Sequence, residues 1–115
     1  MKDPSCPFCR IVAKDQPAEV VLDRDQVLAF RDRNPVAPVH VLVVPKEHLP
    51  SLEAVAERHA PLLGGLVEAV NDVAQAEGIA GAFRLVSNVG AEAGQSVRHL
   101  HLHLLGGRRM SWPPG

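Results

Sequence analysis

Histidine and leucine alternate near the C-terminus, where residues 99–103 read His-Leu-His-Leu-His. A period of two is the period of a β-strand, in which successive side chains point to opposite faces. The run therefore predicts a strand over 100–105 with His99, His101 and His103 on one face and leucines on the other. Neighbouring rings would lie about 6.5–7 Å apart, close enough for two or three of them to act on one substrate group. Three titratable rings make poor core material, so this run is the strongest indication of function.

The remaining sequence predicts an α+β domain with a mainly antiparallel sheet. Apolar and β-branched runs predict further strands over 19–22, 27–31, 39–44 and 83–87. Short helices are expected over 9–14 and, with Ser51 as N-cap, over 52–57. A longer helix has Pro61 in its first turn and ends before Gly78, and its Gly64 and Gly65 would let it approach another backbone closely. Strands, then helices, then strands are typical of the α+β class.

Composition limits the class of partner. The chain has 115 residues, 46% of them hydrophobic, which suffices for one domain with a core. A formal net charge of −1 argues against bulk attraction to nucleic acid or to a membrane surface. Aromatic residues make up 3%, without a tyrosine, which disfavours base stacking on an aromatic platform. No apolar run approaches about 20 residues, and the first residues lack a signal-peptide core, so we expect a cytoplasmic protein with neither nucleic acid nor membrane as partner.

The alternating histidines have two chemical uses. Neutral imidazole is a good zinc ligand, and it can also act as a nucleophile flanked by proton donors. A solvated polar strand face is the alternative without a function. The preceding loop, 88–96, favours a phosphate site because glycines let backbone N–H groups approach an anion and Gln95 and Ser96 add donors. Arg98 adds positive charge nearby but is expected to point away from the histidines.

Two cysteines stand close together as Cys6-x-x-Cys9. A redox pair of this kind would lie between a strand and a helix. Because no strand is predicted before Cys6, half of a metal site is the better interpretation of the pair. Two cysteines packed beside Phe8 are the alternative.

Three histidines outside the alternating run differ in what they indicate. His40, in the strand over 39–44, either faces the same site or is a hydrogen-bonded core residue. His48 either completes a Cys/Cys/His ligand set or lies at the surface. His59 is expected to be exposed.

Residues 94–108, which include the alternating run, resemble the signature of the histidine triad (HIT) nucleotide-binding family. The tail over 106–115, and residues 28–32 and 37–46, are similar to the Hint branch of that family. The resemblance implies one HIT domain over 1–115, with a five-stranded sheet that continues across a two-fold dimer. It also implies that the tail reaches the partner's active site, so that Trp112 would serve a neighbouring subunit.

The resemblance assigns catalytic roles. His101 would be the nucleophile that attacks the α-phosphorus of a nucleotide, and water would then hydrolyse the nucleotidyl-histidine. His99 and His103 would orient the triad and bind phosphate. His40 would take part in a relay behind the nucleophile, and Ser96 would help to protonate the leaving group.

Further residues are implied to bind substrate. Asp32 would accept hydrogen bonds from both ribose hydroxyls, and the base would be held by apolar contact, which predicts tolerance between purines. The implied phosphate contacts are Asn88, Gly94, Gln95 and the Val97 backbone N–H, and the implied base pocket is Phe8, Ile11, Phe30 and Leu42.

The resemblance also implies an activity and a metal. The activity is hydrolysis of purine nucleoside 5′-phosphoramidates; the alternatives are hydrolysis of dinucleoside polyphosphates, or a non-catalytic zinc- and nucleotide-binding module. Bacterial relatives with the cysteine pair imply a structural zinc on Cys6, Cys9, His48 and His99. No cofactor is expected for catalysis itself.

Overall fold

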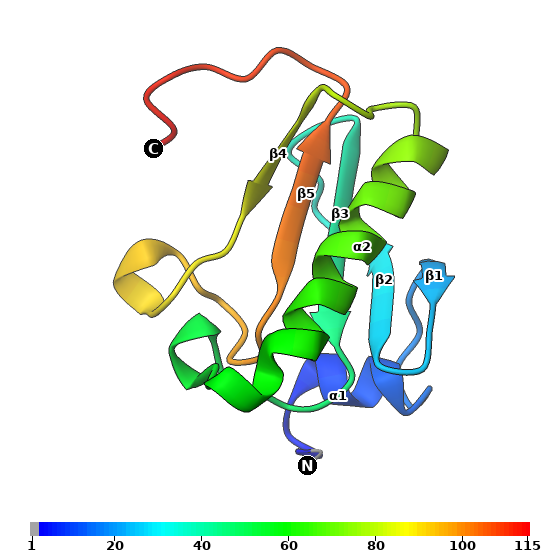
Figure 1. Ribbon diagram of the computed structural model, residues 1–115, viewed down its shortest axis with the longest axis vertical. Coiled ribbons are helices and arrows are strands. Elements are labelled where there is room, and N and C mark those ends of the chain that lie inside the picture. The colour runs from blue at the N-terminus through cyan, green and yellow to red at the C-terminus, as the bar shows by residue number, and fades with distance from the viewer. Residues whose placement is uncertain (1–2) are drawn as a thin grey trace.

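The computed structural model describes residues 3–115, which form a five-stranded antiparallel sheet with α-helices packed against it (Figure 1). The strands are β1 (Val20–Asp23), β2 (Val27–Arg31), β3 (Val39–Pro45), β4 (Phe83–Val86) and β5 (Leu102–Gly106), and they lie in the order β1-β2-β3-β5-β4. The helices are the short α1 (Pro7–Val12) and the long α2 (Ala60–Ala76). The predicted α+β class and antiparallel sheet are confirmed.

The sheet separates two apolar clusters, one on each face. On β3, Val41 packs in the cluster under α2, whereas its neighbour Leu42 packs with α1 on the opposite face. Strands β2 and β3 are thus covered on both faces, which explains their nearly continuous apolar sequence. On β5, Leu102 and Leu104 belong to the α2 cluster, so the alternating histidines face α1.

The strand that carries the histidines begins later than predicted. Paired residues of β5 start at Leu102, opposite Val43, and Leu100 and His101 precede it outside the ladder. If the pairing continued in the same register, Leu100 would lie opposite Pro45 of β3, which has no N–H to donate to a ladder. The Leu100 N–H instead donates to the Leu49 carbonyl at 2.6 Å. The alternation of faces nevertheless continues, because Leu100 is buried in the α2 cluster.

The long helix begins and ends as predicted. Pro61 lies in its first turn. Gly78, with φ of +76°, follows its end, where the N–H groups of Gly78 and Ile79 donate to Gln75 and Ala74 in a Schellman motif. Among residues 3–115 no helix has the length and apolarity to cross a bilayer.

Two expectations for the helical region are wrong. Residues 52–57 form no α-helix but two 3₁₀ turns, Leu52–Ala54 and Glu57–His59, although Ser51 caps the first of them as expected. The helix glycines allow no close backbone approach, since a Cβ at Gly64 would meet nothing within 4 Å and one at Gly65 only a Val27 methyl group at 3.9 Å.

Candidate active site and metal centre

His101 has one ring nitrogen without a hydrogen bond to residues 3–115. Its Nδ1 lies 2.6 Å from the His99 carbonyl oxygen, and a carbonyl can only accept, so Nδ1 carries the proton. The neutral ring then has its lone pair on Nε2. The ring is buried, packs edge-to-face on Phe8 at 5.1 Å between centroids, and lies 4.9 Å from the His103 ring, closer than the strand spacing alone predicts. A neutral imidazole held in this tautomer is suited to nucleophilic attack.

A further set of hydrogen bonds joins the residues beside the His101 ring. The Val36 N–H donates to His40 Nδ1 at 3.1 Å, so the neutral His40 ring carries its proton on Nε2. That nitrogen lies 2.9 Å from His103 Nδ1 and 3.3 Å from an Asp32 carboxylate oxygen. The other Asp32 oxygen accepts the Asn34 N–H at 2.7 Å. His40 therefore faces the triad, and Asp32 lies with it.

Burial keeps His40 and His103 neutral. Desolvation, together with smaller effects of the neighbouring His101 and His40 rings, lowers the pKa of His103 from 6.5 to about 4, against the opposing effect of the Asp32 charge. Desolvation also lowers the pKa of His40, against the opposing effect of the Asp32 charge. Both rings are thus uncharged near pH 7 and can pass a proton rather than hold one.

The neutral state of His103 predicts a loss of stability in acid. The unfolded chain binds a proton at this ring below about pH 6.5 and the folded chain only below about pH 4, so the stability is complete above 6.5 and is lost as the pH falls toward 4. After allowance for partial exposure, the loss is about 2 kcal/mol. Urea unfolding at pH 7 and pH 4.5 measures it, and His103→Gln should show a smaller change; the same change in both proteins would contradict the assignment.

A cavity of about 650 Å³ opens beside these rings. Phe8 and Phe30, whose ring centroids lie 5.3 Å apart in an edge-to-face contact, form an apolar wall of the cavity. Asp32 lies in the same lining. Of the site residues expected from sequence, the cavity is lined by Phe8, Ile11, Phe30, Asp32, Leu42, Ser96, Val97, His101 and His103. The structure thus brings the implied base pocket, ribose acceptor and triad to one place.

The loop before the triad is stabilised by its own side chains. Gln95 is buried, its amide oxygen accepts the Gly90 N–H at 2.9 Å, and its amide nitrogen donates to the carbonyls of Pro50 and Val97. The Asn88 amide reaches the Gly94 carbonyl at 3.5 Å, where Gly94 adopts the left-handed conformation with φ of +98°. The phosphate contacts expected from Asn88, Gly94 and Gln95 stay predictions, and their visible role is to shape the loop that presents Ser96 and Val97.

The second cluster joins Cys6, Cys9, His48 and His99. His99 Nε2 donates to the Pro45 carbonyl at 2.8 Å, so the lone pair of the fully buried ring is on Nδ1. That atom lies 3.3 Å from Cys6 Sγ, 3.6 Å from Cys9 Sγ and 3.1 Å from His48 Nδ1, and the Cys9 Sγ lies 3.3 Å from His48 Nδ1.

These donors fit a zinc ion. A tetrahedral zinc with bonds of ordinary length places its ligand atoms about 3.3–3.8 Å apart. Both cysteines are free thiols, and burial raises the pKa of the Cys6 thiol, so its thiolate needs a nearby positive charge. A zinc ion would supply that charge and crosslink three segments of chain, since both cysteines lie at the start of α1, and the carbonyl of Pro45 would orient His99 as a ligand.

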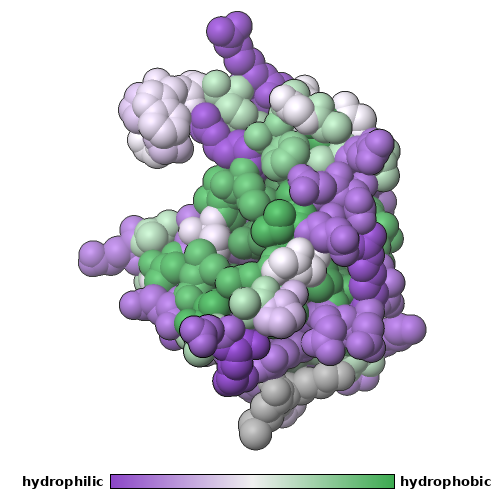
Figure 2. Space-filling view, viewed as in Figure 1, coloured by the Kyte–Doolittle hydropathy of each residue, from purple (hydrophilic) through white to green (hydrophobic). Residues whose placement is uncertain are grey.

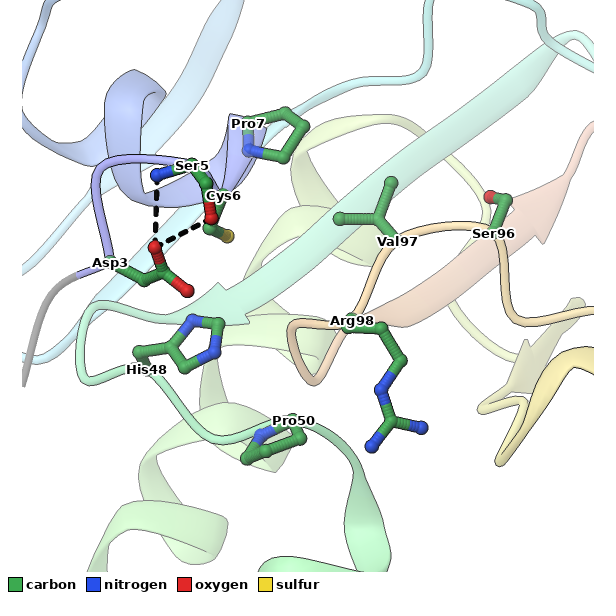
Figure 3. A pocket seen from close by; sticks show the side chains of 9 residues that line it. All are labelled: Asp3, Ser5, Cys6, Pro7, His48, Pro50, Ser96, Val97 and Arg98. Carbon is green, nitrogen blue, oxygen red and sulfur yellow. Dashed lines mark hydrogen bonds between the residues drawn. The ribbon is translucent and has the colours of Figure 1, made fainter.

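A smaller cavity, of about 340 Å³, lies beside this cluster. Figure 3 shows Cys6 and His48 on one side of it and Val97 on the other. Arg98 is exposed and lines this cavity but not the larger one that contains His101 and His103, so the expectation that it points away from the histidines stays a prediction. Ser96 and Val97 line both cavities and form the partition between them.

Two further residues that the sequence singles out lie outside both clusters. His59 is buried, not exposed, and its Nδ1 accepts the Ala56 N–H at 2.8 Å at the start of the helical region. Trp112 is 80% exposed and lies near the Arg84 guanidinium rather than in the larger cavity of its own chain, so its role in a partner's site stays a prediction.

Comparison with known proteins identifies the family. The HIT domain model matches residues 13–110. The chain is 48% identical over 110 residues to the adenylylsulfatase HINT1 of Arabidopsis thaliana, covering 94% of this chain and 75% of the relative, and 47% identical over 110 residues to the 14 kDa zinc-binding protein of Zea mays, covering 94% and 86%. A HIT family hydrolase from Clostridium thermocellum has a TM-score of 0.93 and 42% identity, with 96% of each chain covered. The chain belongs to the HIT family.

Proposed function

We propose that this protein is a nucleotide hydrolase that cleaves the P–N bond of purine nucleoside 5′-phosphoramidates through a covalent intermediate on His101. The observation that carries the proposal is the tautomer of that ring, whose protonated Nδ1 faces the His99 carbonyl and whose Nε2 is free. Relatives named as hydrolases, one of them an adenylylsulfatase, support the reaction class.

In the first step, His101 Nε2 forms a bond to the α-phosphorus and the P–N bond breaks. The leaving amine takes a proton from the Ser96 hydroxyl, which is replenished from solvent at this exposed position. The His99 carbonyl stabilises the imidazolium that forms, because it continues to accept the Nδ1 proton. Val97 lines the cavity, and its backbone N–H would hold a phosphate oxygen as charge develops.

In the second step, water attacks the phosphorus, the N–P bond breaks and His101 is restored. Asp32 would hold the ribose, and the apolar wall of Phe8, Ile11, Phe30 and Leu42 would accept a purine without reading its edge. None of these steps uses a metal. Zinc at the second cluster, when bound, supplies a structural crosslink.

Relative turnover distinguishes the candidate activities. We expect adenosine 5′-phosphoramidate to be cleaved faster than a diadenosine polyphosphate or adenylyl sulfate at equal concentration, with AMP followed by chromatography. Faster turnover of the polyphosphate would establish the alternative hydrolase. Stoichiometric AMP binding without turnover of any of the three would establish a binding module.

We also propose that the protein is a homodimer in which the sheet continues through β4. This strand lies at the edge of the sheet, and Leu85 on it is 39% exposed. Figure 2 shows apolar side chains gathered beside α2, over the part of the sheet that contains β4 and β5. An unpaired edge with apolar surroundings favours pairing with another strand.

A charge on this edge should separate the subunits. Leu85→Asp is expected to convert a dimer to a monomer by light scattering after size exclusion. Val20→Asp is the matched control, since Val20 is 46% exposed on β1, the opposite edge of the sheet. A dimer that survives Leu85→Asp but not Val20→Asp would place the interface at β1.

A further inference from the structure

We propose that metal binding at Cys6, Cys9, His48 and His99 controls the affinity of the neighbouring cavity for nucleotide. The cluster and the cavity share two segments of chain, residues 6–11 at the start of α1 and residues 97–101. The inference rests on the proposed function only for the identity of the ligand, a nucleotide.

The first connection runs through α1. Cys6 is the N-cap of this helix and Cys9 lies in its first turn, whereas Phe8 and Ile11 of the same six residues line the nucleotide cavity. A helix of this length is not stable alone and depends on its attachments. A metal held by both cysteines and by two histidines from elsewhere would fix this wall of the cavity to the sheet.

The second connection runs through His99. Its ring offers Nδ1 to the cluster, and its backbone carbonyl accepts the Nδ1 proton of His101. Because the ring and the carbonyl belong to one residue, the position of the His99 ring affects the position of the carbonyl that orients His101. Phe8 joins both connections, because its ring packs edge-to-face on His101 at 5.1 Å and on His99 at 5.9 Å.

Without metal, the cluster holds its parts together only weakly. Thiols are poor hydrogen-bond donors, and the two histidine nitrogens lie 3.1 Å apart. We expect α1 to loosen and Phe8 to leave the His101 ring part of the time. Cys6 and His48 line the cavity beside the cluster (Figure 3), so we expect metal to leave and return through it without unfolding of the domain.

Thermodynamic linkage makes the proposal testable in both directions. Titration calorimetry of AMP is expected to show about tenfold weaker binding to chelated protein than to zinc-loaded protein. By reciprocity, AMP must tighten zinc binding by the same factor. Equal AMP affinity in the two states would overturn the proposal.

A variant separates loss of metal from damage to the cavity. His48→Ala removes one ligand but leaves α1 and the triad intact, and we expect its AMP affinity in zinc to match that of the chelated wild type. Ser5→Ala is the control, since Ser5 adjoins Cys6 but hydrogen-bonds only Asp3 among the described residues, and it should behave as wild type. If His48→Ala fails to fold, chelation and zinc return on the wild-type protein decide the question.

Hydrogen exchange keeps this inference separate from the proposed function. If zinc-loaded protein bound no AMP, the nucleotide assignment would fail, and exchange at residues 8–12 would then decide the coupling. Lower protection of these amides after chelation, restored by zinc, is the expected result. Unchanged protection would show that the metal does not hold α1 and would overturn the inference.

Discussion

Replacement of His101 by alanine is expected to lower kcat/KM for an adenosine 5′-phosphoramidate by at least about 10³-fold. The substitution removes the nitrogen that would carry the nucleotidyl group, and no other ring replaces it. His103 directs Nδ1 toward His40, and His99 directs its own Nδ1 toward the cysteines. The loss should therefore fall on kcat, with the cavity still able to bind AMP.

Mass spectrometry gives the direct form of this test. Wild-type protein quenched in alkali during turnover should carry a nucleotidyl group on the peptide that contains His101, and His101→Ala should carry none. His59→Gln is a control of the same residue type, because His59 lies outside the nucleotide cavity. Turnover by His101→Ala within tenfold of wild type, or an adduct on another residue, would exclude the mechanism.

The sequence predicted which face the histidines share, but it could not predict their tautomers. Alternation with leucine is a local pattern, so it fixes the face wherever the chain is extended. The tautomers of His101 and His40 instead depend on the His99 carbonyl and the Val36 N–H. Backbone groups carry no sequence signature, and their direction is known only once the chain is folded.

The distinction between local sequence patterns and contacts made only in the folded chain also explains the other differences between prediction and structure. Cys6, Cys9, His48 and His99 come together as the family resemblance implied, although spacing alone left His48 undecided. The segment over 52–57 has helix-forming residues but is divided into two turns, the second of which leads into α2 and buries His59. That burial depends on tertiary packing, which local propensity does not contain.

Truncation of Leu104 to alanine is expected to lower the free energy of unfolding by about 3 kcal/mol. Leu104 is fully buried under α2, opposite Val41 on β3 and Leu85 on β4, so the substitution leaves a cavity between three strands and the helix. Urea unfolding at one fixed protein concentration measures the change, since a dimer would otherwise add a concentration-dependent contribution.

The activity of Leu104→Ala tests the division of the sheet into a face under α2 and a face toward the cavity. Leu104 follows His103 directly, yet its side chain lies on the opposite face from the nucleotide cavity. Well below the unfolding transition we therefore expect kcat/KM within about tenfold of wild type, because the backbone ladder to β3 still holds His103 in place.

Leu52→Ala, at a leucine that is 39% exposed, should cost less than about 1 kcal/mol. Equal destabilisation by the two substitutions would contradict the packing of Leu104. Collapse of activity in a folded Leu104→Ala protein would show that the α2 face, and not the ladder alone, positions the triad.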